Sequence, residues 1–161
     1  MAILLRKVDN QANWIRYPDA FHLPVKVVSS DCWPTNDSLS MWSALTEFDI
    51  PRVAAALAAT RDYLTNVDFL MTTDATLDDL DISRQQSPGE TPYIVMNDHH
   101  MDVTSLTFGQ LFCLCDEFQR CEKRRVPKSE IKAMLMYAID TEQIDPHKLK
   151  STLCRAVLGT A

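Results

Sequence analysis

The sequence predicts an α+β fold in which a mixed or antiparallel sheet packs against helices and the C-terminal region is helical. Three observations indicate this class. Short β-rich runs alternate with helical patterns, capping signals mark helices in both halves of the chain, and no internal repeat is present in its 161 residues. With 46% hydrophobic and 24% charged residues, the composition is that of an ordinary globular protein, and we expect one domain over residues 1–161.

The first third of the chain is predicted to consist of strands and turns. Residues 3–8 and 14–17 are short apolar runs, and residues 25–29 form a β-branched run after a proline. Residues 30–37 are rich in turn-forming residues and are expected to form a loop. Apolar side chains then alternate over residues 39–45 with the period of two that is typical of a strand.

The clearest helix signal lies at Asp49, which can cap a helix that has a proline in its first turn. Phe48 can pack on Val53 as a hydrophobic staple, and apolar residues at helical spacing carry the helix to about residue 65. The β-rich run 67–72 follows. Strand, helix and strand therefore succeed one another as in a crossover unit.

The middle of the chain is predicted to be less regular. The acidic stretch 74–81 contains enough leucine for a short helix, whereas residues 83–92 have no periodicity and are predicted to form a long loop. Residues 93–96 and 103–106 are short strand candidates on either side of a polar block. Long loops of this kind are usually functional or mobile.

Three helices are predicted for the last third. Thr107 and Gln110 form a capping box for the first helix, and its apolar stripe begins at Phe108. A second helix is expected over residues 129–139, and Asp145 followed by proline opens a third that ends before Gly159.

Charge is distributed unevenly along the chain. Residues 1–119 hold 7 Lys and Arg against 17 Asp and Glu, whereas residues 120–161 hold 9 against 5. We therefore distinguish an acidic α+β body from a basic helical C-terminal region within the single domain. A net charge of −6 disfavours nucleic acid as a general ligand and favours attraction to a basic partner.

Several functional classes are disfavoured by residue counts. Three glycines are too few for a phosphate-binding loop, which argues against P-loop NTPases and dinucleotide-binding Rossmann units. Five cysteines without Cys-x-x-Cys spacing fit neither a closed disulfide framework nor a zinc site. The apolar run at the N-terminus is too short for a signal peptide, and no stretch of the sequence is long and apolar enough to predict a membrane-spanning helix. We expect free thiols, a cytoplasmic location and no cofactor.

One alternative function rests on the block Asp98-His99-His100 with Asp102, where metal-ligating residue types crowd together. Imidazole and carboxylate groups suit a divalent transition metal, and a metal-bound water could drive hydrolysis. Adjacent residues on a strand face opposite ways, however, so both histidines join one site only if the backbone turns there. A metal-dependent hydrolase remains open on this pattern.

A second alternative is a DNA-binding regulator. The two C-terminal helices resemble a helix-turn-helix arrangement in which Lys148, Lys150 and Arg155 reach phosphate groups. The positive excess is modest, and the acidic body would be repelled by the same phosphates. Two amphipathic helices that close the core are the structural alternative.

The acidic stretch is interpreted as an electrostatic docking face for a cationic protein. Aromatic residues beside it could supply apolar anchors, as they do in many interfaces. The residues that we expect to bind the partner are five carboxylates and one tryptophan: Asp74, Asp78, Asp79, Asp81, Glu90 and Trp33.

The layout of the chain resembles the small acidic immunity proteins carried beside polymorphic toxin genes in bacteria. The resemblance covers residues 14–119 and lies in the negative body, the strand 39–45 that leads into the helix around residues 52–57, and the proline-rich loop 87–92. It implies a non-enzymatic, cytoplasmic protein that neutralises a cognate toxin, which is expected to be basic. The basic C-terminal helices depart from the pattern.

Overall fold

The computed structural model describes residues 2–159, and its centre is a six-stranded sheet in which every neighbouring pair of strands is antiparallel. The order across the sheet is β4-β5-β2-β1-β3-β6. The strands are β1 (Ile3–Val8), β2 (Ser38–Ala44), β3 (Val67–Thr73), β4 (Arg84–Gln86), β5 (His100–Thr104) and β6 (Lys123–Val126). The predicted α+β class is confirmed.

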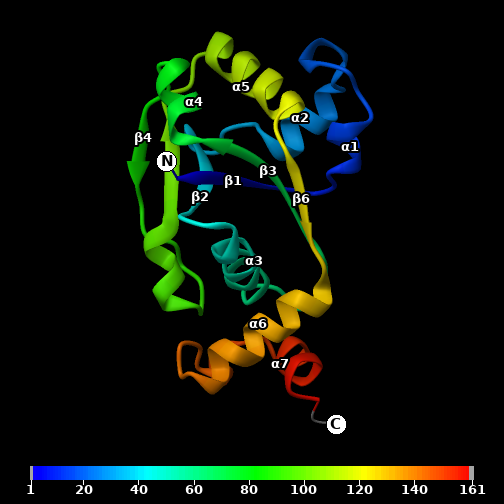
Figure 1. Ribbon diagram of the computed structural model, residues 1–161, viewed down its shortest axis with the longest axis vertical. Helices are drawn as coiled ribbons and strands as arrows, with labels where there is room; N and C mark the ends of the chain where they lie inside the picture. The colour runs from blue at the N-terminus through cyan, green and yellow to red at the C-terminus, as the bar shows by residue number, and fades with distance from the viewer. Residues whose placement is uncertain (1, 160–161) are drawn as a thin grey trace.

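Helices cover both faces of this sheet (Figure 1). One layer contains α1 (Ala12–Ile15), α2 (Val25–Asp31), α4 (Asp74–Asp79) and α5 (Phe108–Arg120). The opposite layer contains α3 (Ile50–Ala58), α6 (Lys128–Asp140) and α7 (Ser151–Leu158). Four short 3₁₀ helices complete the fold: η1 (Ala20–His22), η2 (Glu47–Asp49), η3 (Ile94–His99) and η4 (Pro146–Lys148).

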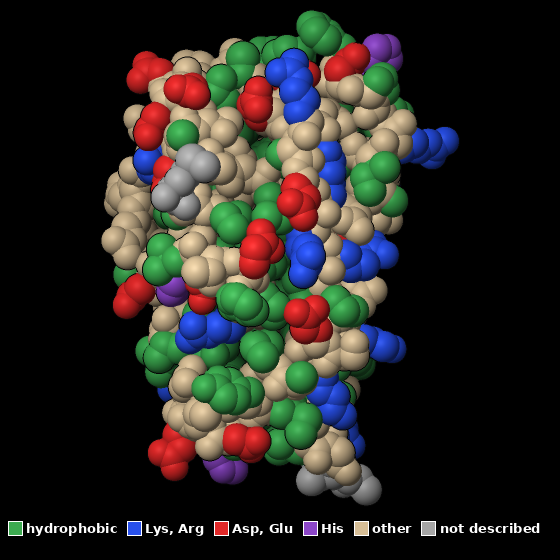
Figure 2. Space-filling model, in the orientation of Figure 1, with side chains coloured by type: hydrophobic (Ala, Val, Ile, Leu, Met, Phe, Trp, Pro, Cys, Tyr) green, Lys and Arg blue, Asp and Glu red, His purple; other side chains and the backbone are tan. Residues whose placement is uncertain are grey.

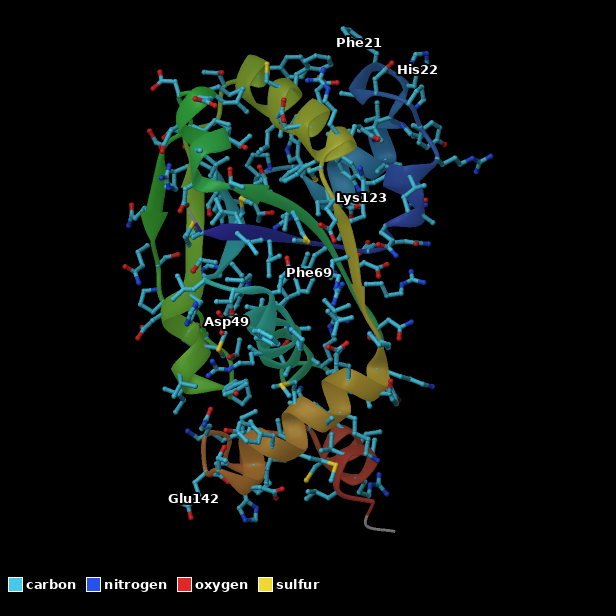
Figure 3. The ribbon with its side chains drawn as sticks, in the orientation of Figure 1. Phe21, His22, Asp49, Phe69, Lys123 and Glu142 are labelled. Atoms are coloured by element: carbon cyan, nitrogen blue, oxygen red, sulfur yellow. The ribbon has the colours of Figure 1, made fainter. Side chains whose placement is uncertain are left out.

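The central strands are apolar on both sides because each side of the sheet faces a hydrophobic core. Leu4 and Leu5 are neighbours on β1, and both are fully buried, one in each core. On β3, Phe69 belongs to the core shared with α3 and α6, as Figure 3 shows, whereas Leu70 belongs to the other core. The alternation of side chains along a strand therefore separates two cores with one sheet.

The predicted strand-helix-strand unit is present. Both β2 and β3 run antiparallel to β1, so they run in the same direction, and α3 connects them across the intervening strand. The helix is shorter than predicted and ends at Ala58. Phe48 is 87% exposed and forms no staple. Asp49 shares a capping box with Thr46 at the start of η2 and makes no side-chain cap on α3.

Three predicted strands are helical in the structure. Residues 14–17 overlap α1, residues 25–29 lie in α2, and residues 93–96 enter η3. Long-range contacts override the local β propensity here: buried Trp14 donates a hydrogen bond from its indole nitrogen to Asp31 at 2.8 Å, which couples α1 to α2.

The predicted loop 83–92 is more ordered than its composition indicates. Its first part forms β4, which pairs with β5. Asn97 then fixes the rest: its side-chain oxygen accepts hydrogen bonds from the backbone N–H and the hydroxyl group of Thr91 at 3.1 and 2.8 Å, and its carbonyl accepts the N–H of Gly89 at 2.8 Å. The side chain and the backbone carbonyl of Asn97 thereby hold residues 89–91 of this irregular segment.

The C-terminal region is helical, as predicted, but it begins with a strand that the sequence analysis missed. Residues 123–126 form the edge strand β6, which pairs with β3. Asp145 caps η4 and not α7, whereas Gly159 ends α7 in the left-handed conformation that favours glycine (φ 70°). No helix within residues 2–159 combines the length and the apolarity that crossing a membrane requires.

Candidate functional site

An apolar groove of about 430 Å³ lies between α2 and α5. Its first wall consists of Leu23 just before α2, Val25 and Val28 in the helix, and Trp33 just after it. Val25 is 83% exposed and Trp33 is 56% exposed. Such large apolar side chains open to solvent in one place are typical of a surface that binds a partner.

The second wall is one stripe of α5. Phe108, Leu111, Phe112 and Cys115 line the groove, and their spacing of three and four residues places them on one helix face over two turns. Phe108 is 78% exposed at the rim, whereas Leu111 and Cys115 are buried in the floor. This stripe is only partly covered by the protein's own chain.

Hydrogen bonds fix the start of α5. The Thr107 hydroxyl accepts the backbone N–H of Gln110 at 3.2 Å, and the Gln110 side-chain oxygen accepts the N–H of Thr107 at 3.0 Å, as the predicted capping box requires. The Gln110 amide also donates to the carbonyl of Asp81 at 2.6 Å. The acidic helix α4 is thus tied to the end of α5 that carries Phe108.

The α2 wall is anchored by a buried carboxylate. Asp31 is 1% exposed and accepts hydrogen bonds from the Trp14 indole and from the backbone N–H of Asp9 at 3.1 Å. The Arg6 guanidinium donates to the carbonyl of Asp31 at 2.6 Å and to that of Ser40 at 2.7 Å. Burial lowers the pKa of Arg6, and the nearby Asp31 charge opposes that effect.

The groove continues at both ends. Phe21 of η1 packs edge-on against Phe112 with ring centroids 4.7 Å apart, and Figure 3 shows Phe21 and His22 projecting from this end of the molecule. Beyond Phe108, a second hollow of about 290 Å³ extends toward Pro34 and Asp37. The apolar surface is therefore longer than the deepest part of the groove.

Carboxylates outnumber cations in the segments next to the groove. The segments that build or border it, residues 19–37, 74–81 and 105–120, contain nine Asp and Glu against two cations, Lys26 and Arg120. Only one of the nine, Asp31, is buried. Figure 2 shows carboxylates at the upper end of the molecule, over α4 and α5, and cations along the right-hand side. The groove thus lies in a negative potential.

The structure brings some of the predicted docking residues together. Trp33 lines the groove, and Asp78, Asp79 and Asp81 lie on α4 or just after it, next to the start of α5. Glu90 does not join them, because it lies past the far end of β4, in the loop held by Asn97.

Two of the predicted aspartates are already paired. Arg84 of β4 contacts the Asp78 carboxylate at 2.7 Å and that of Asp74 at 3.7 Å. The hydrogen bond from Arg84 lowers the pKa of Asp78. Asp74 also accepts the backbone N–H of Ala2 at 3.2 Å. Part of the charge predicted for docking is therefore neutralised within the chain.

In the alternative metal site, the Nδ1 atom of each histidine lies within hydrogen-bond distance of a backbone carbonyl oxygen. The Nδ1 atom of His99 lies 3.1 Å from the carbonyl oxygen of Ser43, and that of His100 lies 2.6 Å from the carbonyl oxygen of Ser87. Among residues 2–159, no group of three or more His, Cys, Asp or Glu side chains is placed to hold a metal ion. The predicted cluster is spread along η3 and β5.

Ser87, His100 and Asp102 lie close together, but their geometry is not that of a catalytic triad. The Ser87 hydroxyl donates to the Asp102 carboxylate at 2.5 Å, and the Nδ1 atom of His100 faces the Ser87 carbonyl and therefore carries the proton. Burial raises the pKa of Asp102, but hydrogen bonds from Ser38 and Ser87 outweigh it and lower the net value. The group fastens the loop to the sheet.

The C-terminal helices close a core. Ile131, Leu135 and Ala138 of α6 and Leu153 and Val157 of α7 are buried in the cluster that contains α3. The basic residues of the DNA-binding alternative lie on the outer surface at the end of the molecule opposite α5 (Figure 1).

No model of a known protein family matches the chain. No curated protein and no solved structure is significantly similar to it either.

Sequence reasoning missed most of the groove. The apolar stripe of α5 is visible in the sequence, but nothing local shows that it borders a groove, and the β-branched run 25–29 indicates a strand where the structure has α2. A usable signal was present, since the pattern Val25, Val28 and Ser29 also fits one face of a helix. That the two faces meet across a groove follows only from tertiary packing.

Proposed function

We propose that the protein is a non-enzymatic binding protein that takes up a basic partner protein in the groove between α2 and α5. The observation that carries the proposal is the set of exposed apolar side chains Val25, Trp33 and Phe108, which belong to segments where carboxylates outnumber cations. Aromatic anchors supply the binding free energy of most interfaces, and surrounding charges speed association with an oppositely charged partner.

The size of the molecule is adequate for such an interface. Its accessible surface is 8672 Å², and a specific protein complex buries roughly 800 Å² on each partner. The groove and its continuation toward Asp37 would form the centre of such an interface, and the surrounding surface would supply the rest of the buried area.

We further propose that the partner is a bacterial toxin and that the protein is its cytoplasmic immunity protein. The resemblance of the acidic body to small immunity proteins supports this assignment, and the negative surround of the groove agrees with it, because toxins that act on nucleic acid carry positive surfaces. Binding would neutralise the toxin by covering its active site or by holding it in an inactive shape.

The test is affinity capture from the source organism with the intact protein and two variants of matched chemistry. Phe108→Asp places a charge in the groove, whereas Phe48→Asp places the same charge at an equally exposed phenylalanine in η2. We expect a basic protein to be retained by the wild type and by Phe48→Asp and to be lost from Phe108→Asp. Expression of that protein alone should arrest growth, and co-expression of the wild type should restore it.

Retention that is indifferent to Phe108→Asp would reject the groove as the binding site. A retained partner that is harmless to cells would reject the immunity role while leaving protein binding in place.

A further inference from the structure

We infer that the part of the partner that enters the groove is a basic amphipathic α-helix. This inference rests on the proposed function and adds the conformation and chemistry of the bound segment. It follows from the backbone chemistry of the groove, from its shape and from the charge around it.

Backbone chemistry favours a helix over an extended peptide. The groove is walled by α2 and α5, whose N–H and C=O groups are used within the helices, and neither edge strand of the sheet borders it. The lining side chains with polar atoms are those of Ser29, Trp33 and Cys115. An extended segment would leave its own N–H and C=O groups unpaired on this surface, whereas a helix satisfies them internally.

The shape of the groove fits a helix. Phe108 and Cys115 are seven residues apart on α5, which corresponds to about 10 Å, or two helical turns. The stripe of α2 that begins at Val25 lies opposite. Two facing helical stripes leave a hollow that a third helix fills with side chains at positions i, i+3, i+4 and i+7.

The negative charge around the groove determines which residues the polar face of the bound helix should carry. Nine carboxylates belong to the segments that build or border the groove, and eight of them are not buried. Arg84 pairs with Asp74 and Asp78, and Arg120 pairs with Asp116 and Glu117, yet with Lys26 included the carboxylates still outnumber the cations, so the polar face of an incoming helix meets a negative rim. Lysine or arginine flanking the apolar stripe would be attracted, and aspartate or glutamate would be repelled. The occupant is therefore basic as well as amphipathic.

The experiment uses synthetic 14-residue peptides and the intact protein. The first peptide places leucine at i, i+3, i+4, i+7 and i+11 among lysines; the second has the same composition in an order without an apolar stripe; the third replaces lysine by glutamate. Trp33 is a built-in reporter, because it is exposed whereas Trp14 and Trp42 are buried. We expect the first peptide to shift the tryptophan emission to the blue, gain helical circular dichroism and bind about 10-fold or more tightly than the others.

The two phenylalanine variants provide the site control. Phe108→Asp should weaken binding of the first peptide about 10-fold, and Phe48→Asp should leave it unchanged. Binding of the first peptide without gain of helix, or equal binding of the second peptide, would overturn the inference while capture of a basic protein could still succeed. Failure of capture with intact peptide binding would instead reject the proposed function.

Two other occupants would also overturn the inference. Displacement of the peptide by dodecanoate at micromolar concentration would assign the groove to a small apolar ligand. Concentration-dependent dimers in sedimentation that Phe108→Asp abolishes would assign it to a second copy of this chain.

Discussion

Two buried aspartates show how single residues hold this fold. Asp31 accepts hydrogen bonds from N–H groups of Trp14 and Asp9, and the two oxygens of Asp68 accept hydrogen bonds from Nε and one terminal nitrogen of the Arg125 guanidinium, each at 2.8 Å. Each joins segments that are distant in sequence. A buried carboxylate is stable only when its oxygens are bonded, so both positions tolerate little change.

Asp68 makes stability sensitive to acid. Burial raises its pKa, but the Arg125 pair and the N–H of Gln11 lower it more, and the net pKa lies below the usual value. Because the folded pKa is lowered, the stabilisation is complete above the unfolded pKa of about 3.9 and is lost as pH falls through the folded value.

Asp68→Asn should therefore lower the free energy of unfolding by about 1–3 kcal/mol at pH 7, and the difference from the wild type should shrink below about pH 4. Urea unfolding monitored by circular dichroism at both pH values measures this, with the exposed Asp79→Asn as the control. A difference that stays constant with pH would show that Asp68 has the same pKa in the folded and unfolded states and would contradict this account.

Gly89 lies where a side chain does not fit. A Cβ atom there would come within 2.9 Å of the Trp42 ring and 3.2 Å of the Asn97 side-chain oxygen. Gly89→Ala should push the loop away from the sheet and cost about 1–3 kcal/mol in thermal or urea unfolding. Gly109→Ala is the matched control, because nothing lies within 4 Å of a Cβ atom at that position, and equal losses in both variants would contradict the packing account.

The reactivity of each cysteine thiol should depend on whether its side chain is buried. Burial raises the pKa of Cys121 to about 11, and Cys32 and Cys115 are buried, whereas Cys113 is exposed on α5. Iodoacetamide at pH 8 should therefore modify Cys113 well before these three, as peptide mass spectrometry would show. Early modification of Cys115 would show that the floor of the groove opens in solution.

At the scale of elements, the capping box of α5 links local sequence to the candidate site. Thr107→Ala removes the acceptor for the N–H of Gln110 and should cost about 1 kcal/mol of stability. The first turn that carries Phe108 should fray, so hydrogen exchange at residues 108–111 should speed up more than exchange in α6. Unchanged exchange there would mean that the contact of Gln110 with Asp81 is sufficient to hold the turn.

Capping patterns predicted helix ends with mixed success, because Asp49 and Asp145 make no side-chain cap on α3 and α7 and belong instead to the 3₁₀ helices η2 and η4. Thr107 and Gly159 mark real helix ends because their hydrogen bonds and backbone angles are local. Residues 14–17 and 25–29 have β-rich composition but are helical, since Trp14 and Val27 gain more from burial beneath α5 than from strand pairing. Strand β6 was missed because Lys123, Arg124 and Arg125 suit the exposed edge of a sheet, where charge prevents further pairing.

At the scale of the whole molecule, carboxylates outnumber cations near the groove, whereas the two are nearly balanced in residues 128–158, with five Lys and Arg against four Asp and Glu. The groove and its carboxylates lie at one end, whereas α6, α7 and their basic residues lie at the other (Figure 1). Long-range attraction acts on association rates more than on dissociation, so the rates test its role.

Replacement of Asp37, Asp79 and Asp81 by Asn should slow association of the basic helical peptide several-fold at low salt and flatten its dependence on ionic strength. Asn is chosen because Asp37 and Asp81 have positive φ angles. The control neutralises three exposed carboxylates at the other end, Asp62, Asp140 and Glu142, the last of which is labelled in Figure 3. Stopped-flow tryptophan fluorescence measures both, and equal slowing would assign the effect to net charge alone.

The sequence by itself determined the α+β class, the helix ends at Thr107 and Gly159 and the excess of acidic residues. These features depend on composition and on contacts between neighbours in the chain. Tertiary structure alone decided that β6 forms one edge of the sheet, that Glu90 lies apart from α4, and that the apolar faces of α2 and α5 share one groove. Which side chains meet depends on how the sheet orders its strands and on which helices share a face. That information lies in contacts between distant segments, such as Trp14 with Asp31, which no local pattern records.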